Sequence, residues 1–229
     1  MGKYLALVTV IMILCVSSLT YLGSYPKVNA YAKEDFVAVV DAGHGGVDPG
    51  VISSVHGEKE SDLNLYLAKN LAEHFLADGN FVVMTRTNDN GLYGSLKKGY
   101  KSRDLKRRVE ICKESNADVF ISIHMNKYSD KSRRGAQVFY SAKNQEGKIM
   151  ARYIQDQLNG LDEAVRICTP LAGDYYLLNN LDCPAVIVEC GFLSNALDEE
   201  LLLTESYREK LAHAIYYGVK AYAISRGNL

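Results

Sequence analysis

The chain of 229 residues is long enough to bury one hydrophobic core of ordinary size. Its 26 lysine and arginine residues are balanced by 27 aspartate and glutamate residues, so the composition shows no basic surplus. Proteins that bind nucleic acid usually carry such a surplus. We therefore expect a single domain of catalytic size that does not bind nucleic acid.

Residues 1–30 differ from the rest of the chain. Lys3 precedes an almost wholly apolar stretch over residues 4–16, which weakly polar residues then extend. Such a segment predicts export, either as a signal peptide cleaved after Ala30 or as an uncleaved membrane anchor of about 18 residues. In either case the domain that follows is expected to work outside the cytoplasm, secreted or held at the membrane.

Residues 31–35 are expected to form a linker and residues 36–229 a single catalytic domain, in which apolar runs alternate with amphipathic stretches. The predicted strands are 36–41, 81–85, 119–124, 136–140 and 185–189, and the predicted helices are 60–77, 103–115, 145–159 and 199–224. This alternation predicts an α/β fold, with a mostly parallel twisted sheet flanked by helices. Ligands of such sheets bind at the carboxyl ends of the strands.

Three residues able to bind a metal or move a proton stand at the ends of predicted strands. His44 follows the first strand in VVDAGHGGVDPG, His124 closes the third in VFISIHMN, and Glu189 closes the last in PAVIVECGFLSN. We expect these side chains to meet at the carboxyl edge of the sheet. Each has an ordinary structural alternative, because strand-end histidines are often only hydrogen-bonded and strand-end glutamates are often paired with arginine.

Glu60 is expected to point into the protein from the first turn of a helix. Apolar residues recur every four positions and mark the packed face, namely Leu63, Leu67, Leu71 and Phe75. Glu60 falls on this face, whereas Glu58 and Asp62 are rotated from Leu63 by about 140° and about 100°. A carboxylate on the buried face must be paired, bound to a metal or protonated.

Two histidines and one glutamate are a ligand set typical of a catalytic zinc site, in which water takes the fourth position. His44, Glu60 and His124 together predict such a site, although no H-E-x-x-H motif is present. Glu189 beside it would suit a general base. The remaining histidines are expected to be ordinary exposed or half-buried side chains, namely His56, His74 and His213.

The five cysteines have no C-x-x-C spacing, so the sequence predicts neither a zinc knuckle nor a thioredoxin-like site. Most are expected to be small core residues. Cys183 and Cys190 could form a disulfide in an oxidising compartment. If residues 186–190 are an extended strand, however, the two lie too far apart to bond.

Four segments resemble, in order, the signature blocks of the zinc-dependent N-acetylmuramoyl-L-alanine amidases of the Amidase_3 type. They are VVDAGHGGVDPG, GEKESDLNLYLAKNLAEHF, ADVFISIHMN and PAVIVECGFLSN, and the resemblance covers about residues 36–224. It implies that His44, Glu60 and His124 bind Zn²⁺ and that Glu189 is the catalytic glutamate. It also implies hydrolysis of the amide bond between N-acetylmuramic acid and L-alanine in peptidoglycan, which removes stem peptides.

Two features of the sequence differ from those of other family members and indicate which subgroup the chain resembles. Cell-division members carry a long insertion after the third block that occludes the zinc, whereas here MNKYSDKSRRG leads from His124 straight to the next predicted strand. The chain also shows no wall-binding repeat. It most resembles the sporulation and germination-specific cortex amidases, which prepare muramic acid for lactam formation. We expect its N-terminal segment to bring it to the membrane and an accessory envelope lipoprotein to raise its activity.

Three arginines could recognise the substrate, and two other functions would fit the same residues. Arg133, Arg134 and Arg166 are candidates to meet stem-peptide carboxylates, with solvated loop charge as the alternative. Another exported zinc peptidase, such as a carboxypeptidase, would share the ligands but release free amino acids. A non-catalytic envelope-binding module is the alternative outside enzymes, and it predicts that Glu189→Gln leaves function intact.

Overall fold

The computed structural model describes residues 36–53 and 55–228. They belong to one compact unit, Glu34–Leu229. The signal peptide or anchor predicted at 1–30 and the linker predicted at 31–35 lie outside the described residues. Within the described ranges, none of the helices combines the length and the apolar character needed to cross a bilayer.

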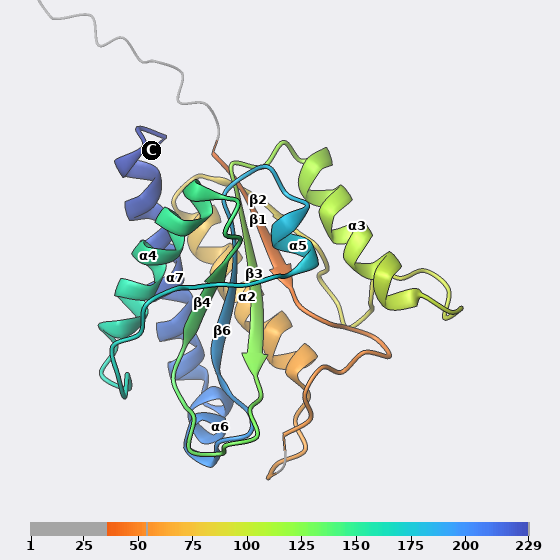
Figure 1. The fold of residues 1–229 in the computed structure, drawn as a ribbon, viewed down its shortest axis with the longest axis vertical. Coiled ribbons are helices and arrows are strands. Elements are labelled where there is room, and N and C mark those ends of the chain that lie inside the picture. The colour runs from red at the N-terminus through yellow and green to blue at the C-terminus, as the bar shows by residue number, and fades with distance from the viewer. Residues whose placement is uncertain (1–35, 54, 229) are drawn as a thin grey trace, which may run out of the picture. The chain divides into compact units, whose positions relative to one another are not determined.

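A six-stranded sheet forms the centre of this unit, in the order β2-β1-β3-β6-β4-β5 (Figure 1). Its strands are β1 (Val37–Ala42), β2 (Phe81–Met84), β3 (Val119–Asn126), β4 (Gln137–Tyr140), β5 (Leu171–Ala172) and β6 (Ala185–Phe192). The strands β2, β1, β3 and β6 are mutually parallel, β4 is antiparallel to β6, and β5 is parallel to β4. The sheet is therefore mostly parallel, as the sequence predicts.

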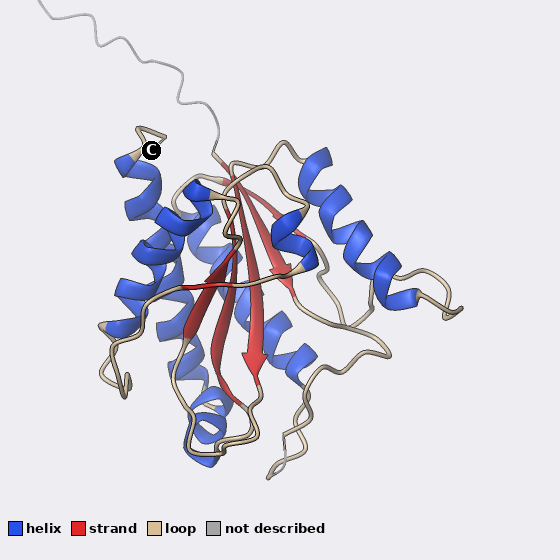
Figure 2. Ribbon diagram, viewed as in Figure 1, coloured by secondary structure: helices blue, strands red, loops and turns tan. Residues whose placement is uncertain are grey.

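Helices cover both faces of the sheet (Figure 2). They are α2 (Glu60–Ala77), α3 (Tyr100–Glu114), α4 (Gln145–Asn159), α5 (Tyr176–Asn179), α6 (Ala196–Leu203) and α7 (Glu205–Ser225). Apolar side chains of α2, α4 and α7 share a core with one face, which includes Val40, and those of α3 and α5 share a core with the other, which includes Val39. This alternation of side chains confirms the predicted α/β domain.

The region 199–224 differs from its prediction as one helix, because the structure has two helices there, α6 and α7. Thr204 between them is extended, with φ of −82° and ψ of 134°, and its side chain accepts a hydrogen bond from the N–H of Tyr207. Threonine favours this N-cap position, so a new helix begins after it. The sequence also missed β5 and α5, which are only 2 and 4 residues long.

The carboxyl ends of β1, β3 and β6 meet at one edge of the sheet, because the three strands are parallel neighbours. The strand register sets Ala42 of β1 beside Ile123 of β3, and His124 of β3 beside Glu189 of β6. The loop that follows β1 leads to α2, which begins at Glu60. This edge therefore collects the residues that the sequence marked as functional.

Candidate active site

His44 lies just beyond β1 in a left-handed backbone conformation, with φ of 61°. Two buried arginines hold this part of the chain through its carbonyl groups. Arg108 donates to the oxygens of Ala42 and His44, both at 2.7 Å. Arg86 donates to the oxygens of Ala42 and Gly43, both at 2.9 Å. These bonds fix a loop that its glycines would otherwise leave free to adopt many conformations.

Glu60 is the first residue of α2 and is only 2% exposed, as its place on the apolar face predicts. Its Oε2 atom accepts a hydrogen bond from the N–H of Val51 at 2.8 Å, and its Oε1 atom accepts one from the N–H of Met125 at 3.2 Å. The N-terminus of a helix also stabilises a negative charge. The backbone around Glu60 is thus arranged to hold a carboxylate inside the protein.

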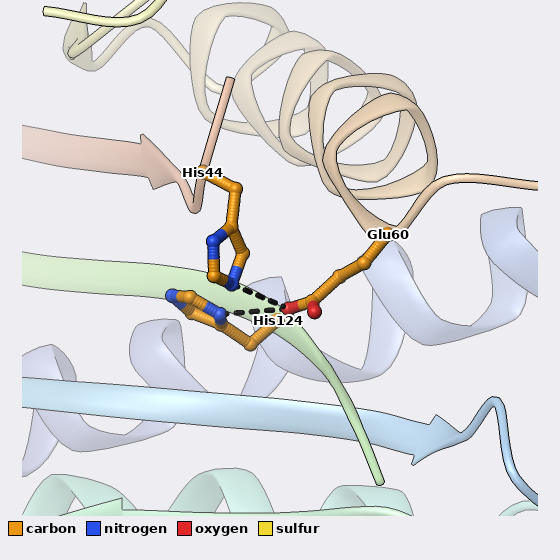
Figure 3. A group of neighbouring side chains, drawn as sticks. All are labelled: His44, Glu60 and His124. Carbon is orange, nitrogen blue, oxygen red and sulfur yellow. Dashed lines mark hydrogen bonds and ion pairs between the residues drawn. The ribbon is translucent and has the colours of Figure 1, made fainter. Parts of the chain in front are cut away.

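The side chains of His44, Glu60 and His124 meet although they come from a loop, a helix and a strand (Figure 3). The Oε1 atom of Glu60 lies 3.2 Å from Nε2 of His44 and 2.9 Å from Nδ1 of His124. One potential ligand atom from each residue lies within 4.8 Å of the other two. The structure brings together the three residues that the sequence marked as metal ligands.

Charge within this cluster favours an ionised Glu60. Burial acts to raise the pKa of its carboxyl group, but the hydrogen bonds and charges of His124 and His44 outweigh burial and hold that pKa well below its ordinary value. Burial likewise disfavours a charged His44, yet Glu60 and Asp48 outweigh it and raise the pKa of the imidazole. The cluster is therefore a buried carboxylate that attracts positive charge.

Two glycines leave room for the ligating side chains. A Cβ atom at Gly43 would lie 2.3 Å from Nε2 of His124, and a Cβ atom at Gly50 would lie 2.4 Å from Oε2 of Glu60. Such distances are far below ordinary carbon contacts, so a side chain at either position would displace its neighbour. The glycine-rich segment after β1 is thus needed for space as well as for turning the chain.

The arrangement of donors fits a zinc ion. Zinc binds imidazole nitrogen and carboxylate oxygen at about 2.0 to 2.2 Å, so tetrahedral ligand atoms lie about 3.3 Å apart. The two nitrogen to oxygen separations on Glu60 are 3.2 and 2.9 Å. Only a small movement of the side chains would admit an ion between them. The cluster can therefore hold a divalent metal.

Asp48 orients His44 and is a residue that the sequence analysis missed. Its Oδ2 atom lies 3.0 Å from Nδ1 of His44, the ring nitrogen that does not face Glu60. Its Oδ1 atom accepts a hydrogen bond from Lys101 at 3.0 Å. A carboxylate on the second nitrogen of a ligating histidine fixes the orientation of the ring. The spacing His-x-x-x-Asp inside the glycine-rich loop is the sequence feature that could have indicated this role of Asp48.

Glu189 lies beside His124 on the neighbouring strand, with its side chain on the same face of the sheet. Its Oε2 atom is buried and has no hydrogen-bond partner among the described residues. Burial raises the pKa of Glu189 from 4.5 to about 7, while His124 opposes this rise and the charge of Glu60 adds to it. A carboxyl group that titrates near neutral pH can both accept and return a proton.

A cavity of about 220 Å³ opens beside the two histidine rings. Its lining includes His44, His124, Tyr93, Tyr100 and Lys101. The rings of Tyr93 and Tyr100 meet edge to face, with centroids 5.5 Å apart. A wall with aromatic rings and a cation suits a ligand that carries both apolar and anionic groups. The segment that supplies these tyrosines has no helical or strand period, so the sequence did not place it here.

The remaining histidines lie outside the cluster of His44, Glu60 and His124, as the sequence analysis expected. A ring nitrogen of His56 lies 2.8 Å from a carboxylate oxygen of Glu199, and one of His74 lies 2.9 Å from a carboxylate oxygen of Glu209. The ring of His213 packs against that of His74, with centroids 5.6 Å apart. These three side chains therefore support the structure at other places.

The arginines proposed for substrate carboxylates have varied surroundings. Arg134 donates to Asp198 at 3.0 Å, so its guanidinium already has an internal carboxylate. The guanidinium of Arg133 lies over the ring of Tyr128, 4.6 Å from the centroid. None of the three arginines lines the cavity beside the histidines. Lys101, which does line it, was not singled out by the sequence.

A family profile described as N-acetylmuramoyl-L-alanine amidase (Amidase_3) matches residues 38–221. The chain belongs to the N-acetylmuramoyl-L-alanine amidase family. The germination-specific N-acetylmuramoyl-L-alanine amidase of Bacillus subtilis is 36% identical over 196 residues, which cover 84% of this chain and 81% of that protein. This amidase family acts on peptidoglycan, so the predicted class of enzyme, a hydrolase of amide bonds, is confirmed.

Solved amidase structures share the fold. The CwlD amidase from Clostridioides difficile, determined in complex with the GerS lipoprotein, has a TM-score of 0.78 and 36% identity, and the match covers 83% of this chain and 100% of that chain. An N-acetylmuramoyl-L-alanine amidase from Clostridium difficile 630 has a TM-score of 0.76 and 32% identity, covering 84% and 99%. The amidase fold predicted from the signature blocks is therefore confirmed.

Proposed function

We propose that this amidase uses a zinc ion bound by His44, Glu60 and His124, and that it removes stem peptides from spore-cortex peptidoglycan. The observation that carries the proposal is the meeting of these three side chains beside Glu189, whose pKa is raised to about 7. The similarity to a germination-specific amidase supports the cortex as the substrate. Residues 1–30 would export the enzyme or hold it at the membrane.

A zinc ion at this site would supply Lewis-acid activation of the amide carbonyl and of water. The chain's own residues supply the rest of the chemistry. Glu189 accepts a proton from the attacking water and returns it to the nitrogen of the leaving L-alanine. Asp48 keeps the ring of His44 in a fixed orientation through its contact with Nδ1, at 3.0 Å. We assign the cavity lined by Tyr93 and Lys101 to the substrate.

The test of this function is the bond that is cut. Purified full chain, supplied with zinc, is expected to release stem peptides with a free L-alanine amino group from cortex peptidoglycan, identified by mass spectrometry. A carboxypeptidase would instead release free amino acids, and a binding module would leave the polymer intact. Vegetative peptidoglycan digested alongside separates a cortex role from a general role in the wall.

The zinc site is checked by a matched pair of variants in the same assay. His124→Ala is expected to lose both bound zinc, measured per chain by elemental analysis, and hydrolysis. His74→Ala removes a histidine that lies outside the cluster and pairs with Glu209, so it is expected to keep both. A wild-type chain that binds no zinc at micromolar supply would contradict the site.

We also propose that an accessory envelope lipoprotein raises the activity of this chain. Support comes from the similar CwlD amidase, which was determined in complex with the GerS lipoprotein. A partner that favours the metal-loaded form by about 1.4 kcal/mol shifts the metal equilibrium tenfold, within the range of common couplings. At limiting zinc, the chain without this partner is therefore expected to be poorly active. If it digests denuded peptidoglycan as fast as it does in a cell extract, no such partner is needed.

A further inference from the structure

Two thiols lie side by side at the end of the sheet opposite the active site. Cys112 is in the last turns of α3, and Cys183 lies in the segment that leads into β6. Their Sγ atoms are 3.7 Å apart, in van der Waals contact. Cys190 lies on the extended strand β6, which the sequence analysis expected to hold it too far from Cys183 to bond, and its sulfur contacts the carbonyl oxygen of Val188 at 3.6 Å.

The pair is open to a reagent from one side. A cavity of about 350 Å³ is lined by both cysteines, and its lining also includes Lys113 and Asn116. Cys112 is buried, whereas Cys183 is partly exposed. The contact between the two thiols lowers the pKa of Cys183 and raises that of Cys112. Cys183 is therefore both the more accessible sulfur and the one that ionises first.

We propose that Cys112 and Cys183 form a disulfide once the chain is outside the cytoplasm, with a disulfide-bearing thiol compound or protein as the oxidant. The thiolate of Cys183 attacks one sulfur of the oxidant and releases the other as a thiol. Cys112 loses its proton and attacks Cys183 in this mixed disulfide, which releases the second thiol of the oxidant. Two electrons and two protons pass to the oxidant, and one sulfur to sulfur bond forms in the protein.

The crosslink would stabilise α3, a helix with few buried residues. Only Arg108, Val109 and Cys112 of α3 are buried, yet the first half of this helix carries Lys101, which lines the active-site cavity. The disulfide would join the end of α3 to the start of β6 and close a loop across 71 positions of the chain. A loop of that size restricts the unfolded chain strongly.

The reactive edge of the sheet is left untouched by this bond, because Cys112 and Cys183 precede the strands β3 and β6 whose far ends carry His124 and Glu189. The inference rests on the proposed export of the chain and not on the proposed chemistry. No third histidine, cysteine or acid joins the two thiols in a metal cluster among the described residues. Oxidation is thus the chemistry that the pair supports.

The test is peptide mapping of the zinc-loaded full chain after equilibration with an oxidised glutathione buffer. We expect one linked pair of peptides that contain Cys112 and Cys183, with a mass 2 Da below the sum of the two reduced peptides. Cys168 and Cys190 are expected to be alkylated as free thiols. Recovery of both Cys112 and Cys183 as free thiols under these conditions would overturn the proposal, and so would a bond between any other pair. Neither outcome depends on whether the chain hydrolyses peptidoglycan.

The stability readout uses a matched pair of variants. Oxidised wild type is expected to melt about 5 to 10 °C above the reduced protein. Cys183→Ser should lose this dependence on reductant, because the partly exposed position tolerates a hydroxyl. Cys168→Ser should keep it, since Cys168 is not a member of the pair. A reductant-dependent shift that survives in Cys183→Ser would also count against the proposal.

Discussion

Glu189→Gln is expected to abolish amide hydrolysis and, at the same time, to stabilise the metal-free protein at neutral pH. The activity falls because glutamine cannot take the proton of water, and loss of a general base typically costs a factor of about 10² to 10⁴. The stability rises because Oε2 of Glu189 is buried with no hydrogen-bond partner among the described residues. A neutral amide there removes an unpaired buried charge.

The raised pKa of Glu189 determines whether the stability of the wild type rises or falls with pH. The pKa of Glu189 is about 7 in the folded chain against an ordinary 4.5, so the folded state binds more protons between these values. The free energy of unfolding of the wild type therefore decreases by up to roughly 3 kcal/mol as pH rises from 4.5 to about 7. Above pH 7 it stays at this lower value, because Glu189 is then ionised in both the folded and the unfolded chain. Thermal unfolding of the chelated proteins should thus show a larger advantage for Glu189→Gln at pH 8 than at pH 5.

Glu199→Gln is the control for both readouts. Glu199 is also buried, with a side chain that is 1% exposed, but its Oε1 atom pairs with His56 at 2.8 Å. Its glutamine variant should be destabilised and should keep hydrolysis. Full activity in Glu189→Gln would remove the assigned proton acceptor and favour the binding-module alternative. If Glu189→Gln changed the stability equally at pH 5 and pH 8, this result would contradict an unpaired buried charge on Glu189 in the wild type.

Arg108→Met is expected to destabilise the fold by about 3 to 5 kcal/mol, the usual cost of leaving a buried charge without its partner. Arg108 contacts Asp41 at 2.5 Å and Asp104 at 2.6 Å, and the side chain of Asp41 has no exposed surface. Arg108 also donates to the carbonyl oxygen of His44. The variant should therefore weaken metal binding as well, because the loop that carries His44 loses an anchor.

Arg107→Met is the matched control on the same helix. The guanidinium of Arg107 is exposed and pairs with Glu110 and Glu114 at the surface, where such contacts are worth less than about 1 kcal/mol. Urea unfolding of the two variants should give clearly different midpoints with similar slopes, and zinc affinity by chelator competition should fall only in Arg108→Met. Equal midpoints for the two variants would show that the Asp41 contact contributes little.

The sequence predicted the parts of the site that follow from periodicity. Glu60 falls on the same helix face as Leu63, so its burial could be computed from spacing alone. The position of His124 at the end of a buried strand placed it at the carboxyl edge of the sheet. The signature blocks added the roles of these residues, which spacing could not supply because Glu60 and His124 are 64 positions apart.

The missed residues act through contacts that have no period in the sequence. Asp48 and Tyr93 come from loops, whose course depends on the bonds they make with the rest of the chain. Arg108 looks like a surface charge in a helix rich in lysine and arginine, and only the fold reveals that it reaches Asp41. Thr204 was read as part of one long helix because apolar residues continue on both sides of it.

The three donors of the metal cluster belong to segments that are distant along the chain, since His44 follows β1, Glu60 is the first residue of α2 and His124 lies near the end of β3. An unfolded chain cannot gather them, so any ion held here binds the assembled domain alone. Free metal at a hundred times its dissociation constant would add about 2.7 kcal/mol to the stability of the fold. Metal supply thus acts on survival of the protein as well as on its chemistry, and a chain deprived of the ion becomes at once inactive and easier to unfold and degrade.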